Sequence, residues 1–268
     1  MFVAGIDIGS VAAKAVVLEL GQDGQPRIAG RSVLPTGWNS AEAARDVLEN
    51  ACKVAKIGRS TLNRTVATGY GRVSVPFASK CVTEISCHAR GASFLFPDTG
   101  IILDIGGQDS KVISLETAGA RPGTVRGFLM NDKCAAGTGR FLQVLSGILA
   151  MPLDALGQAA ATGTPVAISS MCAVFAETEI VGLLAKGTPP ESIAAGVFRS
   201  IARRMCGLAR RIALHDACVF TGGLATSPAF AAILADELGI PVKVPDDPQV
   251  VGALGAALIA MDLAKKGR

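Results

Sequence analysis

The stretch Asp7-Ile8-Gly9-Ser10-Val11-Ala12-Ala13-Lys14 decides the fold, because it returns as Asp104-Ile105-Gly106-Gly107-Gln108-Asp109-Ser110-Lys111. Aspartate, isoleucine, glycine and lysine recur in the same order, and each pair is separated by the same 97 positions. Apolar residues typical of β-strands flank both stretches, so each is predicted to form a β-hairpin around a glycine-containing turn. The recurrence predicts an α/β chain built from two related halves.

Both predicted hairpin tips carry groups that suit a polyphosphate. Glycine lets backbone N–H groups approach phosphate oxygens, and Lys14 adds a positive charge. Asp7 and Asp104 could hold Mg²⁺, mostly through its water ligands, and Gln108 could position an attacking water as a catalytic residue. Two tips that face each other across a cleft would hold the phosphates from both sides. The alternative is a pair of ordinary hairpins with Asp-Gly turns, but two copies in register favour phosphate binding.

Composition narrows the class of protein. The chain has 268 residues, half of them apolar, and 31 glycines, as expected of an α/β protein with tight turns. No apolar run approaches the ~18 residues of a membrane span, and the longest, 250–261, is too short. The first residues resemble a strand rather than a signal peptide, so a cytoplasmic protein without a membrane partner is expected. The net charge of +4 is mild, and no nucleic-acid partner is expected.

Hydrophobic periodicity predicts where the main helices lie, and the internal repeat divides the chain into two halves. One half is expected at 1–95, with a C-terminal helix at 248–268 returning to it, and the other at 96–247. Arg199, Arg203 and Arg210 share one face of the longest predicted helix, and that face is expected to be solvated or to contact a nucleotide. The predicted helices span 40–53, 84–92, 140–149, 173–186, 191–215 and the residues after 249.

The chain has seven cysteines without the spacing of a disulfide framework. Cys134 and Cys172 each precede a predicted helix, where the helix N-terminus favours the thiolate form. Two thiolates are half of what a four-iron cluster needs. The alternative is that both are small buried apolar residues. The cysteines interpreted as structural are Cys52, Cys81, Cys206 and Cys218, and Cys87 has no assigned ligand role.

Several motifs resemble known families. The two Asp-Ile-Gly stretches and T-G-G at 221–223 resemble the acetate and sugar kinase, heat-shock chaperone and actin superfamily. More specific are N-D-K-C-A-A-G-T-G-R-F (131–141), C-A-V-F-A-E-T-E (172–179), A-T-G-Y-G-R (67–72) and E-I-S-C-H-A-R-G-A (84–92). They resemble the ATP-dependent activators (archerases) of 2-hydroxyacyl-CoA dehydratases and the related ATPase subunits of benzoyl-CoA reductase. The resemblance covers nearly the whole chain and implies a duplicated actin-like, ribonuclease H-like fold.

The resemblance implies a homodimer with one [4Fe–4S] cluster, for which each subunit supplies Cys134 and Cys172. ATP binding and hydrolysis, with Mg²⁺, would change the angle between the helices that follow these cysteines. That change would drive a low-potential electron into the dehydratase, and a ferredoxin or flavodoxin would supply the electron. The nucleotide contacts expected are Gly9, Ser10, Val11, Ala12, Ala13, Lys14, Gly106, Gly107, Gly137, Thr138, Gly222, Gly223 and Gln249.

Other interpretations remain open at this level. The adenosine loop reads G-G-L-A rather than the expected G-G-V-A, and with C-A-V it also resembles the smaller ATPase subunit of benzoyl-CoA reductase. The complete D-I-G-G-Q-D-S-K motif favours the homodimeric activator. A small-molecule kinase would use the same fold but shows no acceptor base, and an actin-like filament protein would polymerise with nucleotide.

Overall fold

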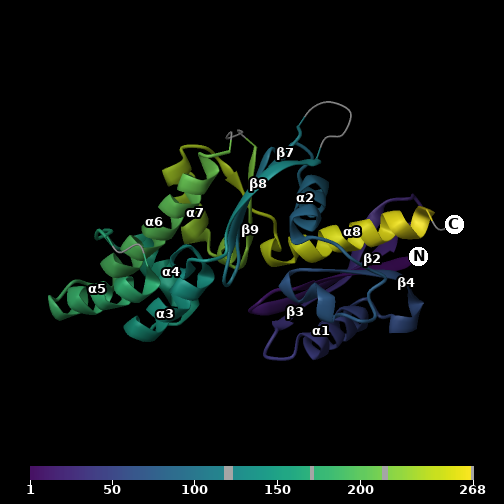
Figure 1. The fold of residues 1–268 in the computed structure, drawn as a ribbon, viewed down its shortest axis with the longest axis horizontal. Coiled ribbons are helices and arrows are strands. Elements are labelled where there is room, and N and C mark those ends of the chain that lie inside the picture. Colours follow the sequence, from purple (N-terminus) through teal and green to yellow (C-terminus); the bar gives the residue numbers. More distant parts are fainter. Residues whose placement is uncertain (118–122, 170–171, 213–216, 267–268) are drawn as a thin grey trace. The chain divides into compact units, whose positions relative to one another are not determined.

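The computed structural model describes residues 1–117, 123–169, 172–212 and 217–266. The chain forms two compact units, each with one five-stranded sheet and its own helices (Figure 1). The first unit comprises Met1–Thr99, Leu115–Arg126 and Gln249–Arg268, and the second comprises Gly100–Ser114 and Gly127–Pro248.

The first sheet is built on the first predicted hairpin and has the strand order β3-β2-β1-β4-β5. Its strands are β1 (Phe2–Ile8), β2 (Ala12–Leu20), β3 (Pro26–Pro35), β4 (Leu62–Thr68) and β5 (Lys80–Cys81). β1 pairs antiparallel with β2, and the register places Asp7 opposite Lys14. β4 runs parallel to β1, with Thr68 beside Asp7. The predicted hairpin is therefore confirmed, and β4 extends it toward a second turn.

Helices cover both faces of the first sheet. They are α1 (Ser40–Val54), α2 (Glu84–Leu95) and α8 (Val251–Lys266), with short 3₁₀ helices η1 (Arg59–Thr61), η2 (Tyr70–Ser74) and η5 (Pro248–Val250). Alternate residues of β1 face opposite helices: Ile6 packs in the cluster with α1, and Val3 in the cluster with α8. Gly5 lies directly against the backbone of α8 at Ala253 and Ala257, where a side chain would overlap it. The small residues of α8 thus permit close packing on β1.

The second sheet repeats the first, with the order β10-β9-β6-β7-β8. Its strands are β6 (Ile101–Ile105), β7 (Ser110–Leu115), β8 (Val125–Asn131), β9 (Cys218–Gly222) and β10 (Val242–Lys243). β6 pairs antiparallel with β7, which places Asp104 opposite Lys111, and β9 runs parallel to β6, which places Thr221 beside Asp104. Each strand of the first sheet therefore has a counterpart in the second, and the duplication predicted from the repeat is confirmed.

The second unit carries most of the helices. They are η3 (Ala135–Gly137), α3 (Gly139–Leu149), α4 (Leu153–Thr162), α5 (Ala173–Ala185), α6 (Pro190–Ala209), η4 (Gly223–Thr226) and α7 (Pro228–Leu238). The helix predicted at 191–215 ends at Ala209, and its predicted end, His215, lies outside the described residues. α4 was not predicted. The rings of Phe198 and Phe220 both contact that of Phe230, at centroid distances of 5.7 Å, in the core.

The C-terminal apolar segment is longer than its sequence suggested. Within the described residues, the helix Pro248–Lys266 is long and apolar enough to cross a membrane, and α3 with α4 would qualify only as one span bent by 86°. The prediction that the C-terminal apolar segment is too short to span a membrane is therefore wrong, because the helix extends beyond 250–261 at both ends. However, 67% of its apolar window is buried, and α8 packs against α2 and strands β1, β2 and β4 (Figure 1). This helix belongs to the core of the first unit.

Candidate functional site

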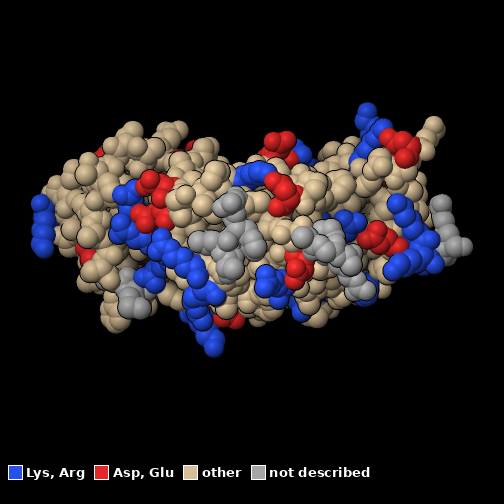
Figure 2. Space-filling model, turned by 90° about the horizontal axis from the view of Figure 1, so that it is seen from above, with Lys and Arg blue, Asp and Glu red and all other residues tan. Residues whose placement is uncertain are grey.

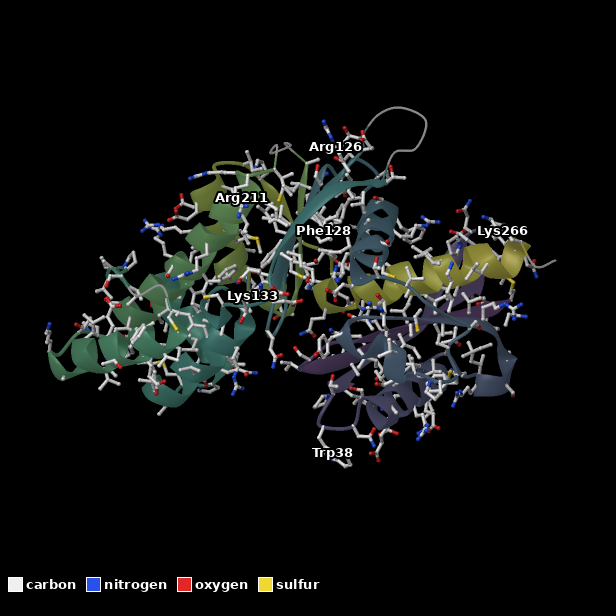
Figure 3. All side chains as sticks on the ribbon, in the orientation of Figure 1. Trp38, Arg126, Phe128, Lys133, Arg211 and Lys266 are labelled. Atoms are coloured by element: carbon white, nitrogen blue, oxygen red, sulfur yellow. The ribbon has the colours of Figure 1, made fainter. Side chains whose placement is uncertain are left out.

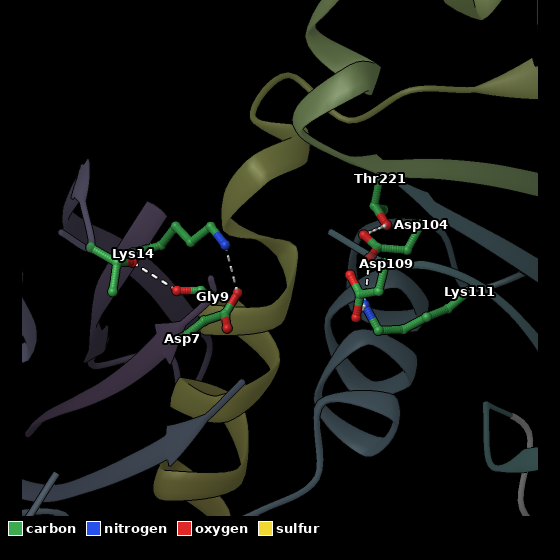
Figure 4. Close-up of polar contacts among 8 residues, drawn as sticks. Asp7, Gly9, Lys14, Asp104, Asp109, Lys111 and Thr221 are labelled. Atoms are coloured by element: carbon green, nitrogen blue, oxygen red, sulfur yellow. Dashed lines mark hydrogen bonds and ion pairs between the residues drawn. The ribbon is translucent and has the colours of Figure 1, made fainter. Parts of the chain in front are cut away.

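The first hairpin presents a lysine beside a buried carboxylate (Figure 4). Asp7 is the last residue but one of β1 and is 6% exposed, and Lys14 Nζ donates to its Oδ2 at 3.2 Å. Thr36, the residue after β3, holds the turn: its Oγ1 donates to the Gly9 carbonyl at 2.7 Å. Residues 10 and 11 at the tip are exposed. The Lys14 side chain keeps 17% of its surface exposed, so its ammonium can meet a ligand at the tip.

The second hairpin holds its charges more tightly (Figure 4). Asp104 is 3% exposed, and both of its oxygens accept hydrogen bonds: Oδ1 from Thr221 Oγ1 at 2.7 Å and Oδ2 from Lys111 Nζ at 3.2 Å. Lys111 also pairs with Asp109 at 2.9 Å, and its side chain is only 3% exposed. Gln108 is exposed at the tip. In this hairpin the buried lysine cross-links Asp104 and Asp109. The groups left at the tip to contact a ligand are the backbone and the Gln108 side chain.

Next to each hairpin, the neighbouring parallel strand ends in a turn that begins with Thr-Gly. β9 ends at Gly222, whose positive φ of 91° leads into η4 and Gly223. β4 ends at Thr68, and Gly69 follows with a φ of 84°. Gly222 lies against the carbonyl of Ile105, so the predicted adenosine loop is beside the second hairpin within one unit. The counterpart in A-T-G-Y-G-R was missed, although the shared Thr-Gly after an apolar strand would have revealed it. Gln249 lies in η5, in the first unit.

Cys134 lies in a turn that is closed by one side chain. Asn131, at the end of β8, accepts from the Cys134 N–H through Oδ1 at 3.2 Å and donates from Nδ2 to the Cys134 carbonyl at 2.9 Å. The neighbouring Lys133 is exposed and labelled in Figure 3. Cys134 is half-buried and precedes η3, not α3, which begins at Gly139. The helix predicted at 140–149 is found as α3, and a turn of 3₁₀ helix that was not predicted lies between it and Cys134.

Two backbone hydrogen bonds fasten the Cys134 segment to the second hairpin. The Gly139 N–H donates to the Gly106 carbonyl at 2.9 Å, and the Arg140 N–H donates to the Gly107 carbonyl at 2.8 Å. They use two of the N–H groups that the first turn of a helix leaves without an intrahelical partner. Thr138, which precedes Gly139, is buried, and its Oγ1 donates to the Ala135 carbonyl at 2.8 Å. Because these contacts lie within one unit, a displacement of the hairpin tip acts directly on the start of α3.

Cys172 is the N-cap residue of α5, as predicted, and it is exposed. The segment before it is tied back to the helix, because Glu179 accepts hydrogen bonds from Ser169 N–H at 2.9 Å and from Ser169 Oγ at 2.8 Å. α5 also exposes apolar side chains, including Val174 at 68% and Phe175 at 70%. An apolar helix face beside a thiol is suited to contact another protein.

Burial distinguishes four of the other thiols from Cys134 and Cys172. Burial raises the pKa of Cys87 and Cys218 to about 12 and that of Cys206 to about 11, and it also raises the pKa of Cys52. These four thiols are therefore poor metal ligands. Cys81, interpreted as structural, is exposed and donates to the Arg72 carbonyl at 3.2 Å.

The two remaining thiols, Cys134 and Cys172, fit half of a cluster site. Both lie in the second unit, and neither is fully buried. The described part of the chain contains no group of three or more His, Cys, Asp or Glu residues that could hold a metal ion. A four-iron cluster takes four thiolates, so these residues fit one only if another chain supplies the rest.

The arginine face of α6 is paired rather than free. Arg199 contacts Asp236 at 2.9 Å, Arg203 contacts Glu237 at 3.2 Å, and Arg210 donates to the Glu237 carbonyl at 3.3 Å. Lysine, arginine and acidic side chains are interspersed over the face shown in Figure 2. These arginines link α6 to α7.

Comparisons with known proteins extend this picture. The family described as BadF/BadG/BcrA/BcrD ATPase matches residues 4–260. The chain belongs to this ATPase family. It is 41% identical to the 2-hydroxyisocaproyl-CoA dehydratase activator of Clostridioides difficile over 100% of this chain and 98% of the relative. It is 43% identical to the (R)-2-hydroxyglutaryl-CoA dehydratase activating ATPase of Acidaminococcus fermentans, over 99% of both chains.

Solved structures agree with this member of the BadF/BadG/BcrA/BcrD family over its whole length. The crystal structure of the Acidaminococcus fermentans dehydratase component A has a TM-score of 0.92 at 41% identity and covers 99% of both chains. The 2-hydroxyisocaproyl-CoA dehydratase activator with bound ADPNP has a TM-score of 0.91 at 40% identity, covering 100% of this chain and 97% of its own. A glucokinase of the ROK family, 15% identical, shares the fold alone, at a TM-score of 0.58. The predicted actin-like fold and the resemblance to dehydratase activators are both confirmed.

Proposed function

We propose that this chain is an ATP-hydrolysing iron–sulfur protein that drives low-potential one-electron transfer to a 2-hydroxyacyl-CoA dehydratase. The observation that carries the proposal is the pair of hydrogen bonds from Gly139 and Arg140 to the carbonyls of Gly106 and Gly107. They connect a predicted phosphate-binding tip with the segment that carries Cys134. The names of the two dehydratase-activating relatives support the same function.

The two hairpins would share the work of binding Mg²⁺-ATP. Lys14 and the glycine amides of both tips would contact phosphates, and Gly222 and Gly223 would admit the adenosine. Both oxygens of Asp104 already accept hydrogen bonds, so this carboxylate is suited to bind a water ligand of Mg²⁺ rather than the ion. Gln108, exposed at the tip, would orient the attacking water. The ADPNP-bound relative supports a nucleotide site in this fold.

Cys134 and Cys172 would hold a [4Fe–4S] cluster together with the same pair from a second copy of the chain. When bound, the cluster supplies a one-electron carrier of low potential. α3 and α5 start near these thiols and would transmit the nucleotide state to them. We further propose a cytoplasmic homodimer that accepts electrons from a ferredoxin or flavodoxin.

The proposal is tested by anaerobic purification and iron analysis. The expected result is a brown protein with about 4 Fe per dimer, the content of one four-iron cluster. Cys134→Ser and Cys172→Ser should each remove the iron, whereas Cys81→Ser, which changes another exposed thiol, should retain it. A colourless protein that takes up no iron after anaerobic reconstitution would contradict the proposal.

A second candidate is the ATPase component of a benzoyl-CoA reductase. One component of the benzoyl-CoA reductase from Thauera aromatica is 29% identical over 95% of this chain and 91% of its own, which is less than the dehydratase activators. Affinity capture under anaerobic conditions with an ATP analogue distinguishes the two. A homodimer that captures a dehydratase supports the first candidate, and a stable heteromer with reductase components supports the second.

A further inference from the structure

The segment before Cys172 is attached to α5 by an acidic side chain. Glu179 lies two turns into the helix, and its carboxylate accepts from both the N–H and the Oγ of Ser169, at 2.9 and 2.8 Å. A second carboxylate oxygen lies 3.2 Å from the same N–H. Hydrogen bonds to a carboxylate are stronger than those between neutral groups. Ser169 is therefore held over α5 three positions before the thiol.

This attachment lies close in the sequence to the start of the helix. Cys172 occupies the N-cap position, but its side chain makes no capping hydrogen bond, and it is exposed. Its own surroundings thus do little to fix the thiol. The Glu179–Ser169 contact instead fastens the chain to α5 three positions before the thiol.

Cys134 has a comparable arrangement. Asn131 makes two hydrogen bonds to the backbone of Cys134, and it lies in the same sequence motif as that cysteine. Glu179 lies in the same motif as Cys172 and makes its paired hydrogen bonds to Ser169. In both motifs one polar side chain therefore makes paired hydrogen bonds to a residue at or near the thiol.

We propose that Glu179 is a positioning residue: it holds Ser169 against α5, three positions before Cys172, and so restrains the direction in which the Cys172 thiol is presented for metal binding. The inference rests on the proposed function, since it assumes that Cys172 is a cluster ligand. Glu179 acts through Ser169 and does not itself bind the metal. Its loss should loosen the thiol without unfolding α5, whose buried contacts at Ala176 and Ile180 remain.

The same motif provides a matched control. Glu177 lies two residues earlier on α5 and is exposed, and no hydrogen bond or ion pair involves it in the part of the chain that the structure describes. Glu177→Gln and Glu179→Gln make the same chemical change on the same helix. Ser169→Ala supplies a milder test, because it removes the Oγ donor and leaves the N–H.

Two measurements test the inference. A nitroxide is attached to Cys172 of the metal-free chain, with Cys81 and Cys134 replaced by serine, and its mobility is read by electron paramagnetic resonance. Iron release to a chelator is then timed in the reconstituted protein with all cysteines present. Glu179→Gln should make the label more mobile and speed iron release roughly three- to ten-fold, because the Gln oxygen can still accept a hydrogen bond from Ser169 but without the charge that strengthens it. Ser169→Ala should act in the same direction but less, and Glu177→Gln should match the wild type.

The inference is overturned if Glu179→Gln and Glu177→Gln give the same label mobility and the same iron release. A different failure would identify an error in the proposed function. If Glu179→Gln loosens the label but the wild-type protein binds no iron, then Glu179 anchors the segment as inferred, and the assignment of Cys172 as a cluster ligand fails.

Discussion

The two hairpins share a sequence and a register but not an environment. Lys111 is 3% exposed and pairs with two carboxylates, whereas Lys14 is 17% exposed and pairs with one, Asp7, among the residues that the structure describes. Thr221 donates to Asp104, whereas its counterpart Thr68 makes no hydrogen bond through Oγ1 to another described nitrogen or oxygen. The duplication preserved the backbone and changed the electrostatics.

The difference indicates a division of labour. The second hairpin is cross-linked internally and bonded to the start of α3, so it is built to transmit a displacement. The first hairpin leaves its lysine partly exposed, so it is built to meet a charged ligand. Substitutions at equivalent positions should therefore give different results in the two halves.

The largest difference is expected at the two lysines. Lys111→Met leaves the buried Asp104 and the nearby Asp109 without their cation and should destabilise the protein by about 3–5 kcal/mol, the usual effect of breaking a buried ion pair. Urea unfolding measures the loss. Equal losses for Lys111→Met and Lys14→Met would show that the hairpins are electrostatically alike.

The glycines after the parallel strands should behave alike, because the backbone is what the halves share. Gly69 and Gly222 both have positive φ, and a side chain at either would overlap backbone atoms of the neighbouring strand. Gly69→Ala and Gly222→Ala should each cost about 2–4 kcal/mol, combining backbone strain with overpacking. Gly24, at a φ of 77° with open space around it, is the control and should lose only about 1 kcal/mol. Unequal losses at Gly69 and Gly222 would argue against a shared backbone.

Substitutions of Thr221 and Thr68 test whether the two hairpins differ in the hydrogen bonding of their aspartates. Thr221→Val removes a hydrogen bond to a buried carboxylate and should cost about 1.5–3 kcal/mol. Thr68→Val replaces a hydroxyl that makes no bond to a carboxylate and has only the Cys87 thiol, a weak hydrogen-bonding group, beside it, so the cost should stay below about 1 kcal/mol. Thermal unfolding of the pair measures both, and a loss at Thr68 as large as that at Thr221 would show that Thr68 also supports its aspartate.

The sequence alone predicted those features of the two hairpins that depend on residues close together in the chain. A repeated Asp-Ile-Gly with a lysine seven positions after the aspartate was enough to predict both hairpins and, through them, the fold. It did not predict which lysine is buried, because Thr221 approaches Asp104 from a strand more than a hundred residues away. Nor did it predict the turn of 3₁₀ helix after Cys134, since the hydrophobic stripe of α3 shows where a helix packs, not how the chain enters it. The contact of Glu179 with Ser169 was missed for the same reason: the two residues lie ten positions apart in the sequence.

Lys14→Met is expected to have the smallest effect on stability and the clearest effect on nucleotide binding. Lys14 has one partner and remains partly exposed, so its loss should cost about 1–2 kcal/mol, less than that of Lys111. If its ammonium meets a phosphate as proposed, the affinity for ATP should fall about ten-fold or more, since a charge-assisted contact is worth at least about 1.4 kcal/mol. Calorimetric titration with a non-hydrolysable analogue measures this, with Lys186→Met, an exposed cation at the end of α5, as the control. An unchanged affinity would show that the exposed lysine of the first hairpin does not serve the nucleotide, and the functional contrast between the hairpins would then lie in the second hairpin alone.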